Sequence, residues 1–375
     1  MKIAFIHNDK KVGTGAHYVN DLMARKLNQF GVEIKNFYPR ISLGGTPAHL
    51  SGIKNILYFY SLLERRDEIL KYKIIQGTTY TPLPFLAYPV PVVSHFGSTT
   101  KGFLDANSRN GLNLEIRKTW LQLKKQGAIS GNLKPLRPLR DIADIEEYVA
   151  KKATAVIATS ENVKKELIDM GVKEEKIHLI YNAIEDYWFE EKNQGFASEP
   201  NIVFLGRLGN DFFTLKLKGL DRLVNLYQHF PQVKKITFCM TSKRNLINWL
   251  NSKIPNHTVF ANVQKDKIPN LLSPLRGSIL FISSRYEGFS LSLIEGMSQG
   301  LVPVVYPVGV APEIIINGEN GFLVNSQAEA IEKVKVLLSD ESLRKKISIE
   351  ASKTAQQFSG IAIVQKLVNL YKSIA

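Results

Sequence analysis

Short apolar runs rich in valine and isoleucine, each followed by a loop and often by a helical stretch, recur along the chain and strongly constrain its fold. Residues 2–6 (KIAFI) precede a glycine-containing loop, a helical pattern that ends at Gly31, and a second apolar run that begins at Val32. Further runs occupy 72–77, 90–97 and 153–160. Strands buried on both faces have this composition, so the pattern predicts an α/β fold with a doubly wound parallel sheet.

The pattern starts again after residues 185–200, a segment with glycine, proline and polar residues. New apolar runs follow at 201–209, 235–240, 258–263, 277–283 and 302–309. A chain of 375 residues also exceeds what one hydrophobic core usually organises. We therefore expect two α/β domains, 1–185 and 186–359. The amphipathic final helix, about 360–375, must bury its apolar face on one of them, and the first domain is one candidate.

The composition indicates a globular protein, with 44% hydrophobic and 22% charged residues. The single cysteine, Cys239, excludes an internal disulfide and is interpreted as a buried strand residue. The N-terminal apolar run is too short for a signal peptide, and no segment is long enough to cross a bilayer, so we expect a cytoplasmic protein. A net charge of +15 predicts an anionic partner, which could be nucleic acid, a phosphorylated ligand or an acidic membrane surface.

Two glutamates, Glu287 and Glu295, lie eight positions apart in the segment 283–297 (SSRYEGFSLSLIEGM). With Glu287 in a loop after a strand and Glu295 on the following helix, they would be separated by roughly 12 Å along the helix axis. They would therefore not share a proton or a metal, and a ligand contacting both must be extended, as a nucleotide sugar is. Alternatively, Glu287 is an ordinary acidic residue at a helix start and Glu295 is solvated. The spacing alone does not decide between these interpretations.

Residues 282–324 (ISSRYEGFSLSLIEGMSQGLVPVVYPVGVAPEIIINGENGFLV) resemble the signature region of family 4 of the retaining glycosyltransferases. The shared features are two glutamates separated by seven residues, a Pro-Val-Val strand and a Gly-x-x-Pro-Glu loop. Residues 153–185 and 201–208 are similar to the segments before and after the family's hinge. The resemblance implies the GT-B fold, in which two Rossmann-like doubly wound domains face each other across a cleft. It places the acceptor on the first domain and the nucleotide sugar on the second.

The resemblance also implies the roles of residues in the second domain. Glu295 would bind the ribose hydroxyls and Glu287 would contact the donor sugar. The backbone amides near Gly288, Phe289 and Ser290 would donate hydrogen bonds to sugar and phosphate oxygens.

Arg207 and Lys218 match the family's basic pair, which neutralises the diphosphate leaving group. Lys216 is an alternative to Lys218, because an unusually long stretch lies between Arg207 and both lysines. In the first domain, His95 matches a histidine near the donor sugar, and Gly15 matches the second glycine of a pair that approaches the phosphate. Surface salt bridges for the basic residues and a structural role for the histidine remain the alternatives.

Several positions depart from the family's pattern, and these departures leave the donor sugar open. Thr14 replaces the first glycine of the glycine pair. Ser290 and Ser292 replace a glycine and a proline between the two glutamates, and Tyr181 and Ala183 replace the residues flanking Asn182.

Together these features predict a retaining glycosyltransferase that moves a hexose, with glucose the first choice, from a UDP-sugar to a glycan or lipid-linked acceptor in surface polysaccharide or glycolipid synthesis. No cofactor and no metal are expected, because no cluster of ligands has metal-binding spacing. A GT-B epimerase or phosphorylase is an alternative. A basic nucleic-acid-binding protein is another, but the basic residues match no recognised nucleic-acid module, so we expect no such partner.

Residues 112–140 carry seven basic residues and one acidic residue. Apolar side chains lie among these charges: Leu112, Leu114, Trp120, Leu121 and Leu123. In one interpretation these side chains pack on the first domain. In the other, the segment contacts an anionic membrane surface and makes the protein peripheral at the inner face of the plasma membrane.

Overall fold

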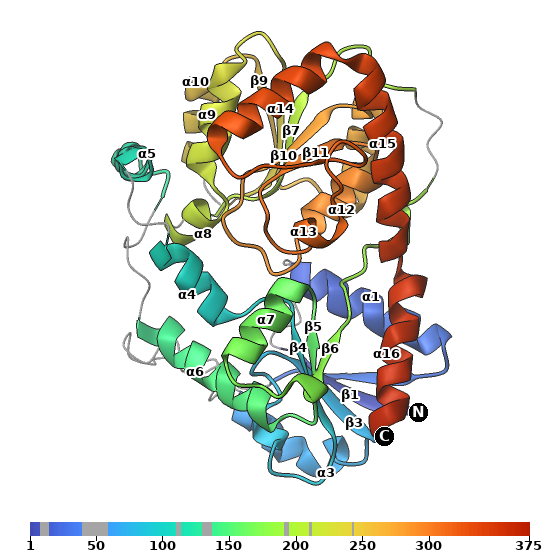
Figure 1. Ribbon diagram of the computed structural model, residues 1–375. Coiled ribbons are helices and arrows are strands. Elements are labelled where there is room, and N and C mark those ends of the chain that lie inside the picture. Colours follow the sequence, from blue (N-terminus) through green and yellow to red (C-terminus); the bar gives the residue numbers. More distant parts are fainter. Residues whose placement is uncertain are drawn as a thin grey trace. The chain divides into compact units, whose positions relative to one another are not determined.

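Two units make up the protein in the computed structural model (Figure 1). The structure describes residues 1–7, 15–39, 59–109, 114–129, 137–190, 195–209, 212–241 and 244–375. The first unit consists of Met1–Leu104, Leu136–Ile184 and Phe358–Ala375. The second consists of Asp105–Pro135 and Glu185–Gln357. Each unit is therefore built from segments that are separated in the sequence.

The first unit contains a parallel sheet with the strand order β2-β1-β3-β4-β5-β6. Its interior strands are almost completely buried, as the valine- and isoleucine-rich runs predicted. The strand bounds are β1 Lys2–Ile6, β2 Glu33–Phe37, β3 Ile74–Thr78, β4 Val92–Phe96, β5 Ala155–Ala158 and β6 Ile177–Leu179.

Helices of the first unit pack around this sheet, and they include the last helix of the chain. Helix α16 contacts α1 (Figure 1). Its buried Tyr371 donates a hydrogen bond of 2.6 Å to the Gln76 side chain on β3. Polar and apolar contacts thus hold α16 in the first unit. The helices are α1 Gly15–Gln29, α3 Arg66–Ile69, α4 Thr100–Arg109 (which continues into the second unit), α6 Arg137–Lys152, α7 Glu161–Asp169 and α16 Gly360–Ile374.

The second unit contains another parallel sheet, with the order β12-β11-β10-β7-β8-β9. Numbered from β7, this is the 3-2-1-4-5-6 order of dinucleotide-binding folds, and the order reverses between β7 and β10. The bounds are β7 Ile202–Arg207, β8 Lys235–Met240, β9 His257–Ala261, β10 Ile279–Ile282, β11 Val302–Val305 and β12 Phe322–Leu323.

Helices cover this second sheet, and local sequence signals set several of their ends. The Ser326 hydroxyl accepts a hydrogen bond from the Glu329 amide at the start of α14, and Asp340 caps α15 in the same way. The helices are α5 Leu114–Lys125, α8 Phe212–Leu217, α9 Leu220–His229, α10 Arg244–Lys253, α11 Ile268–Leu272, α12 Leu291–Ser298, α13 Ala311–Ile314, α14 Gln327–Ser339 and α15 Glu341–Ala355.

The position of α5 differs from the sequence-based expectation, which assigned residues 112–140 to the first domain. Ile116 and Leu123 are buried in the core of the second unit, and Trp120 packs against that core. Leu121 is 52% exposed, whereas Leu112 and Leu114 lie outside the residues whose side chains are described. Most of the described apolar side chains of this segment therefore face protein. In the described part of the chain, no helix combines the length and hydrophobicity that a membrane span requires.

Candidate functional site

The reversal of strand order in the second sheet places two loops side by side. Strand β7 ends at Arg207, and its neighbour β10 ends at Ile282. The carboxyl ends of parallel strands meet at one edge of a sheet, and ligands of open α/β sheets bind where the strand order reverses. The loops that follow β7 and β10 carry most of the predicted site residues, so this edge is the candidate functional site. Arg207 is exposed at the end of β7.

Lys218 lies in the turn between α8 and α9, within the connection that follows β7, and it forms an ion pair with Glu287 in the loop after β10. The distance from Lys218 Nζ to Glu287 Oε1 is 2.5 Å, and the two side chains are 22% and 13% exposed. The Ser284 hydroxyl donates a hydrogen bond of 2.6 Å to the same carboxylate oxygen. A partly buried carboxylate with two donors is held in one orientation. Glu287 is therefore fixed beside a cation that could also meet a ligand's negative group.

Gly219 allows the turn between α8 and α9 to approach the loop after β10 closely. Its φ is +66°, and a Cβ atom at this position would lie 2.0 Å from the carbonyl oxygen of Ser283. The Ser283 hydroxyl in turn donates a hydrogen bond of 2.7 Å to the Lys218 carbonyl. Only glycine satisfies both the backbone conformation and the available space.

Lys216 has a different environment from Lys218. It is 5% exposed, and its side-chain amine donates a hydrogen bond to the carbonyl of Asn107. Burial, followed by the nearby charge of Arg285, lowers the pKa of the Lys216 amine. Of the two lysines considered in the sequence analysis, the structure places Lys218 against Glu287.

Glu295 lies on α12 and is 5% exposed. Its Oε1 atom lies 2.8 Å from the amine of Lys265, which is itself largely buried. The close packing of α12 on β10 sets this position, because a Cβ atom on the adjacent Gly296 would lie 2.5 Å from the Leu280 side chain. The two glutamates therefore contact different lysines. The interpretation of Glu295 as a solvated surface carboxylate is wrong.

Sequence reasoning missed Lys265, which lies in the loop after β9. The signal was present, because a loop that follows a strand of a parallel sheet also reaches the ligand-binding edge. That loop contains three consecutive charged residues, Lys265, Asp266 and Lys267, and the sequence does not indicate which of their side chains is buried.

The backbone between Glu287 and α12 has an unusual conformation. Ser290 has φ +81° and ψ +69°, in the left-handed region, immediately before α12. The carbonyl oxygen of Phe289 accepts a hydrogen bond of 2.9 Å from the Val310 amide. Gly309, with φ +56°, permits this contact, since a Cβ atom there would lie 2.5 Å from the same oxygen. These contacts set the direction of the backbone from Gly288 to Ser290.

Two predicted site residues, His95 and Gly15, belong to the first unit. His95 lies on β4 and is partly buried. Burial lowers the pKa of its imidazole to about 4, although a hydrogen bond with the Asn182 side chain acts in the opposite direction. His95 is therefore neutral at pH 7. Gly15 begins α1, while most of the loop before it, including Thr14, lies outside the described residues.

Comparison with solved structures defines the class of this fold. Sucrose-phosphate synthase from Thermosynechococcus elongatus is 15% identical with a TM-score of 0.75, and the match covers 100% of this chain and 98% of that chain. HepE from Anabaena, in complex with UDP-glucose, is 18% identical with a TM-score of 0.66, and both chains are covered completely. The two units therefore form a GT-B fold.

Family models identify the protein more closely. Residues 34–186 match the model described as Glycosyltransferase Family 4, and residues 186–354 match the model described as Glycosyl transferases group 1. The chain belongs to this family of GT-B glycosyltransferases, which confirms the predicted family and fold.

Two curated relatives match this chain over part of their length. A 41.2 kDa uncharacterized protein in the cps region of Klebsiella pneumoniae is 26% identical over 249 residues, which cover 61% of this chain and 64% of that protein. The capsular polysaccharide biosynthesis glycosyltransferase CapM of Staphylococcus aureus is 25% identical over 250 residues, which cover 59% and 62%. The chain thus matches somewhat less than two thirds of these relatives' length.

Proposed function

We propose that this protein is a retaining glycosyltransferase that transfers a hexose, with glucose as the first choice, from a UDP-sugar to a hydroxyl of a glycan or lipid-linked acceptor. We place this reaction on the cytoplasmic side of the membrane, in surface polysaccharide or glycolipid synthesis. The single observation that carries the proposal is the pair of lysine–carboxylate contacts, Lys218 with Glu287 and Lys265 with Glu295, in the second unit.

A nucleotide sugar fits the chemistry of these contacts. The ribose hydroxyls would donate hydrogen bonds to the Glu295 carboxylate, whose orientation Lys265 holds. The diphosphate would lie near Arg207 and Lys218, which supply the positive charge that the leaving group requires. The hexose would meet Glu287, and backbone amides before α12 would donate to its oxygens.

The proposed reaction proceeds with retention at the anomeric carbon. The acceptor hydroxyl attacks that carbon from the face of the departing UDP, and a phosphate oxygen of the donor takes the hydroxyl proton. The bond from the carbon to the diphosphate oxygen breaks as the new glycosidic bond forms. Arg207 and Lys218 stabilise the developing negative charge on UDP. His95 is assigned to the donor sugar through the family resemblance, and its neutral imidazole could donate a hydrogen bond without adding charge.

The relatives support the donor and the pathway. HepE has been crystallised with UDP-glucose, and CapM is a capsular polysaccharide biosynthesis glycosyltransferase. Both resemble this chain in fold or sequence, so we take UDP-glucose as the first donor to test and a polysaccharide precursor as the first acceptor class.

Mass spectrometry of reactions with a panel of nucleotide sugars tests the proposal. We expect UDP release that depends on an added glycan or lipid-linked acceptor, together with a product heavier by one hexose. Conversion of a UDP-sugar to an isomer without an acceptor would indicate an epimerase, and formation of a sugar 1-phosphate from a glucan would indicate a phosphorylase. Either result would overturn the transferase assignment.

A further inference from the structure

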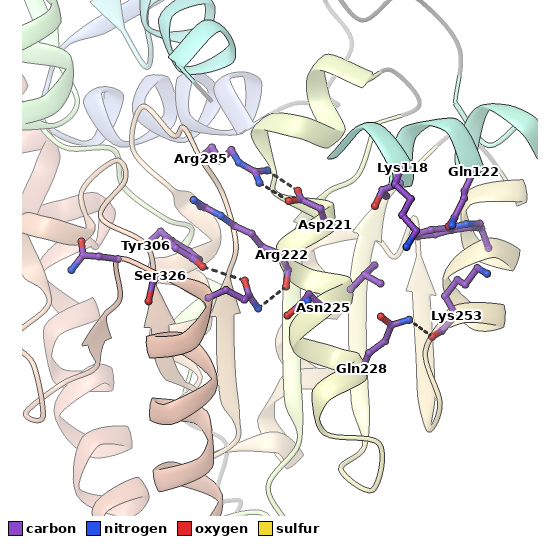
Figure 2. A pocket seen from close by; sticks show the side chains of 15 residues that line it. Lys118, Gln122, Asp221, Arg222, Asn225, Gln228, Lys253, Arg285, Tyr306 and Ser326 are labelled. Atoms are coloured by element: carbon purple, nitrogen blue, oxygen red, sulfur yellow. Dashed lines mark hydrogen bonds and ion pairs between the residues drawn. The ribbon is translucent and has the colours of Figure 1, made fainter. Parts of the chain in front are cut away.

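A cavity of about 490 Å³ lies within the second unit (Figure 2). Its walls come from α5, α9 and α10, from the loops after β10 and β11, and from the start of α14. The volume falls in the range of roughly 300–1,000 Å³ that is typical of small-molecule sites. None of the residues that we assign to the nucleotide sugar lines this cavity. It is therefore a separate candidate binding site.

Positive charge dominates the wall of the cavity. Lys118, Arg222, Lys253 and Arg285 line it, whereas Asp221 is the one carboxylate among the described lining residues. Arg285 already occupies both Asp221 oxygens, with nitrogen–oxygen distances of 2.7 and 2.5 Å. The other three cations therefore have no carboxylate partner in this wall, and an anion would be stabilised there.

Arg222 packs against an aromatic ring of the wall. Its guanidinium carbon lies 3.7 Å from the centroid of the Tyr306 ring. Its Nη1 atom lies 3.3 Å from the Ser284 carbonyl oxygen and 3.4 Å from the Ser283 carbonyl oxygen. These distances are long for hydrogen bonds, so both bonds are weak. Burial, followed by the charge of Arg285, lowers the pKa of Arg222. Two guanidinium groups thus lie near a single carboxylate that Arg285 alone contacts, and a second anion would relieve their repulsion.

Neutral polar groups complete the wall. Gln122, Asn225 and Asn325 line the cavity, and their side-chain amides make no hydrogen bond with another described residue. Gln228 is different, because its amide donates a hydrogen bond of 3.0 Å to the Lys253 carbonyl. A side-chain amide offers both donors and an acceptor, which is the combination that a sugar hydroxyl requires.

We propose that this cavity binds a negatively charged sugar, a saccharide that carries a phosphate or a carboxylate group. The anionic group would contact the two lysines, Lys118 and Lys253, and the charge of Arg222 elsewhere in the wall would add to the attraction, while the sugar hydroxyls would contact the amides. A neutral sugar would provide no negative charge for the cations, and inorganic phosphate would provide no hydroxyl groups for the amides. A charged sugar provides both. The site does not depend on the function proposed for the donor edge.

Isothermal titration calorimetry with four probes tests this assignment: glucose 6-phosphate, glucuronate, glucose and inorganic phosphate. Each titration is carried out with and without UDP, so that binding at the donor site is recognised by competition. We expect both charged sugars to bind regardless of UDP, and at least one of them to bind at least tenfold more tightly than glucose and phosphate.

Charge-matched variants locate the binding. The double variant Lys118→Gln/Lys253→Gln should weaken binding of the charged sugars at least about fivefold, since two cations near the anion are lost. The control Lys125→Gln/Lys234→Gln removes two exposed lysines that do not line the cavity, and it should change affinity by less than about twofold. Three outcomes would overturn the proposal: neither charged sugar binds, phosphate binds as tightly as both, or the two double variants behave alike.

Discussion

At the scale of single residues, the two glutamates of the signature segment have different surroundings, and this predicts different roles. Glu295→Ala should raise the Kd for UDP at least about tenfold, because hydrogen bonds to a charged group contribute roughly 1.5–3 kcal/mol. Glu287→Ala should change that Kd by less than about threefold but lower kcat about 100-fold, since the charge on the sugar changes during the reaction. Calorimetry with UDP and steady-state kinetics measure both effects.

The exposed Glu319 supplies the control for this pair. Glu319→Ala should leave both the UDP affinity and the turnover unchanged. An unaltered Kd in the Glu295 variant would exclude that carboxylate from ribose binding, provided that circular dichroism shows the variant to be folded.

Two serines in the same segment should respond to glycine in opposite directions. Ser290 adopts a left-handed conformation, with φ +81°, that costs most residues about 1 kcal/mol, so Ser290→Gly should stabilise the second unit by about that amount. Ser292 is the second residue of α12, where glycine is a poorer helix former than serine, so Ser292→Gly should destabilise it by up to about 0.5 kcal/mol. Urea unfolding of the two variants checks the signs. A destabilised Ser290→Gly variant would contradict the strain argument.

At the scale of elements, the apolar runs predicted the strands well because burial on both faces leaves little choice of residue. The composition of α5 was less informative. Its Ile116 and Leu123 form an apolar side that could pack against either unit. The rest of the second unit begins only at Glu185, and nothing in the sequence of α5 indicates that it packs against that later segment. Glu287 and Glu295 were selected through the family resemblance, because their spacing alone did not decide their roles. Lys265 was missed because its burial depends on packing between distant loops.

The turn before α9 should be intolerant of any side chain. Gly219→Ala adds a left-handed alanine and places its Cβ against the Ser283 carbonyl, so we expect a loss of more than about 2 kcal/mol of stability and weaker UDP binding. Gly318→Ala is a matched control, because Gly318 has φ +78° but open space around it. Gly318→Ala should lower the free energy of unfolding by only about 1 kcal/mol, the cost of a left-handed alanine. Equal losses in urea unfolding would show that the contact with Ser283 has no effect.

At the scale of the whole molecule, the proposed charge arrangement predicts activity without a divalent metal. Turnover should survive excess chelator, because Arg207 and Lys218 supply the positive charge at the leaving group. Lys218→Gln should lower kcat about 100-fold with or without chelator. Loss of turnover in chelator that manganese or magnesium restores would contradict this mechanism.

The assignment of α16 to the first unit sets the order in which the protein can be completed on the ribosome. The first 184 residues contain every strand of the first sheet, yet Tyr371 and the buried face of α16 emerge only after the second unit has been translated. At about 5–20 residues per second, the first sheet must remain uncovered along its α16 face for roughly 10–40 s. During that interval the nascent chain exposes an apolar surface, so chaperone binding should concentrate on ribosomes that have passed Ile184 but have not yet released the final helix.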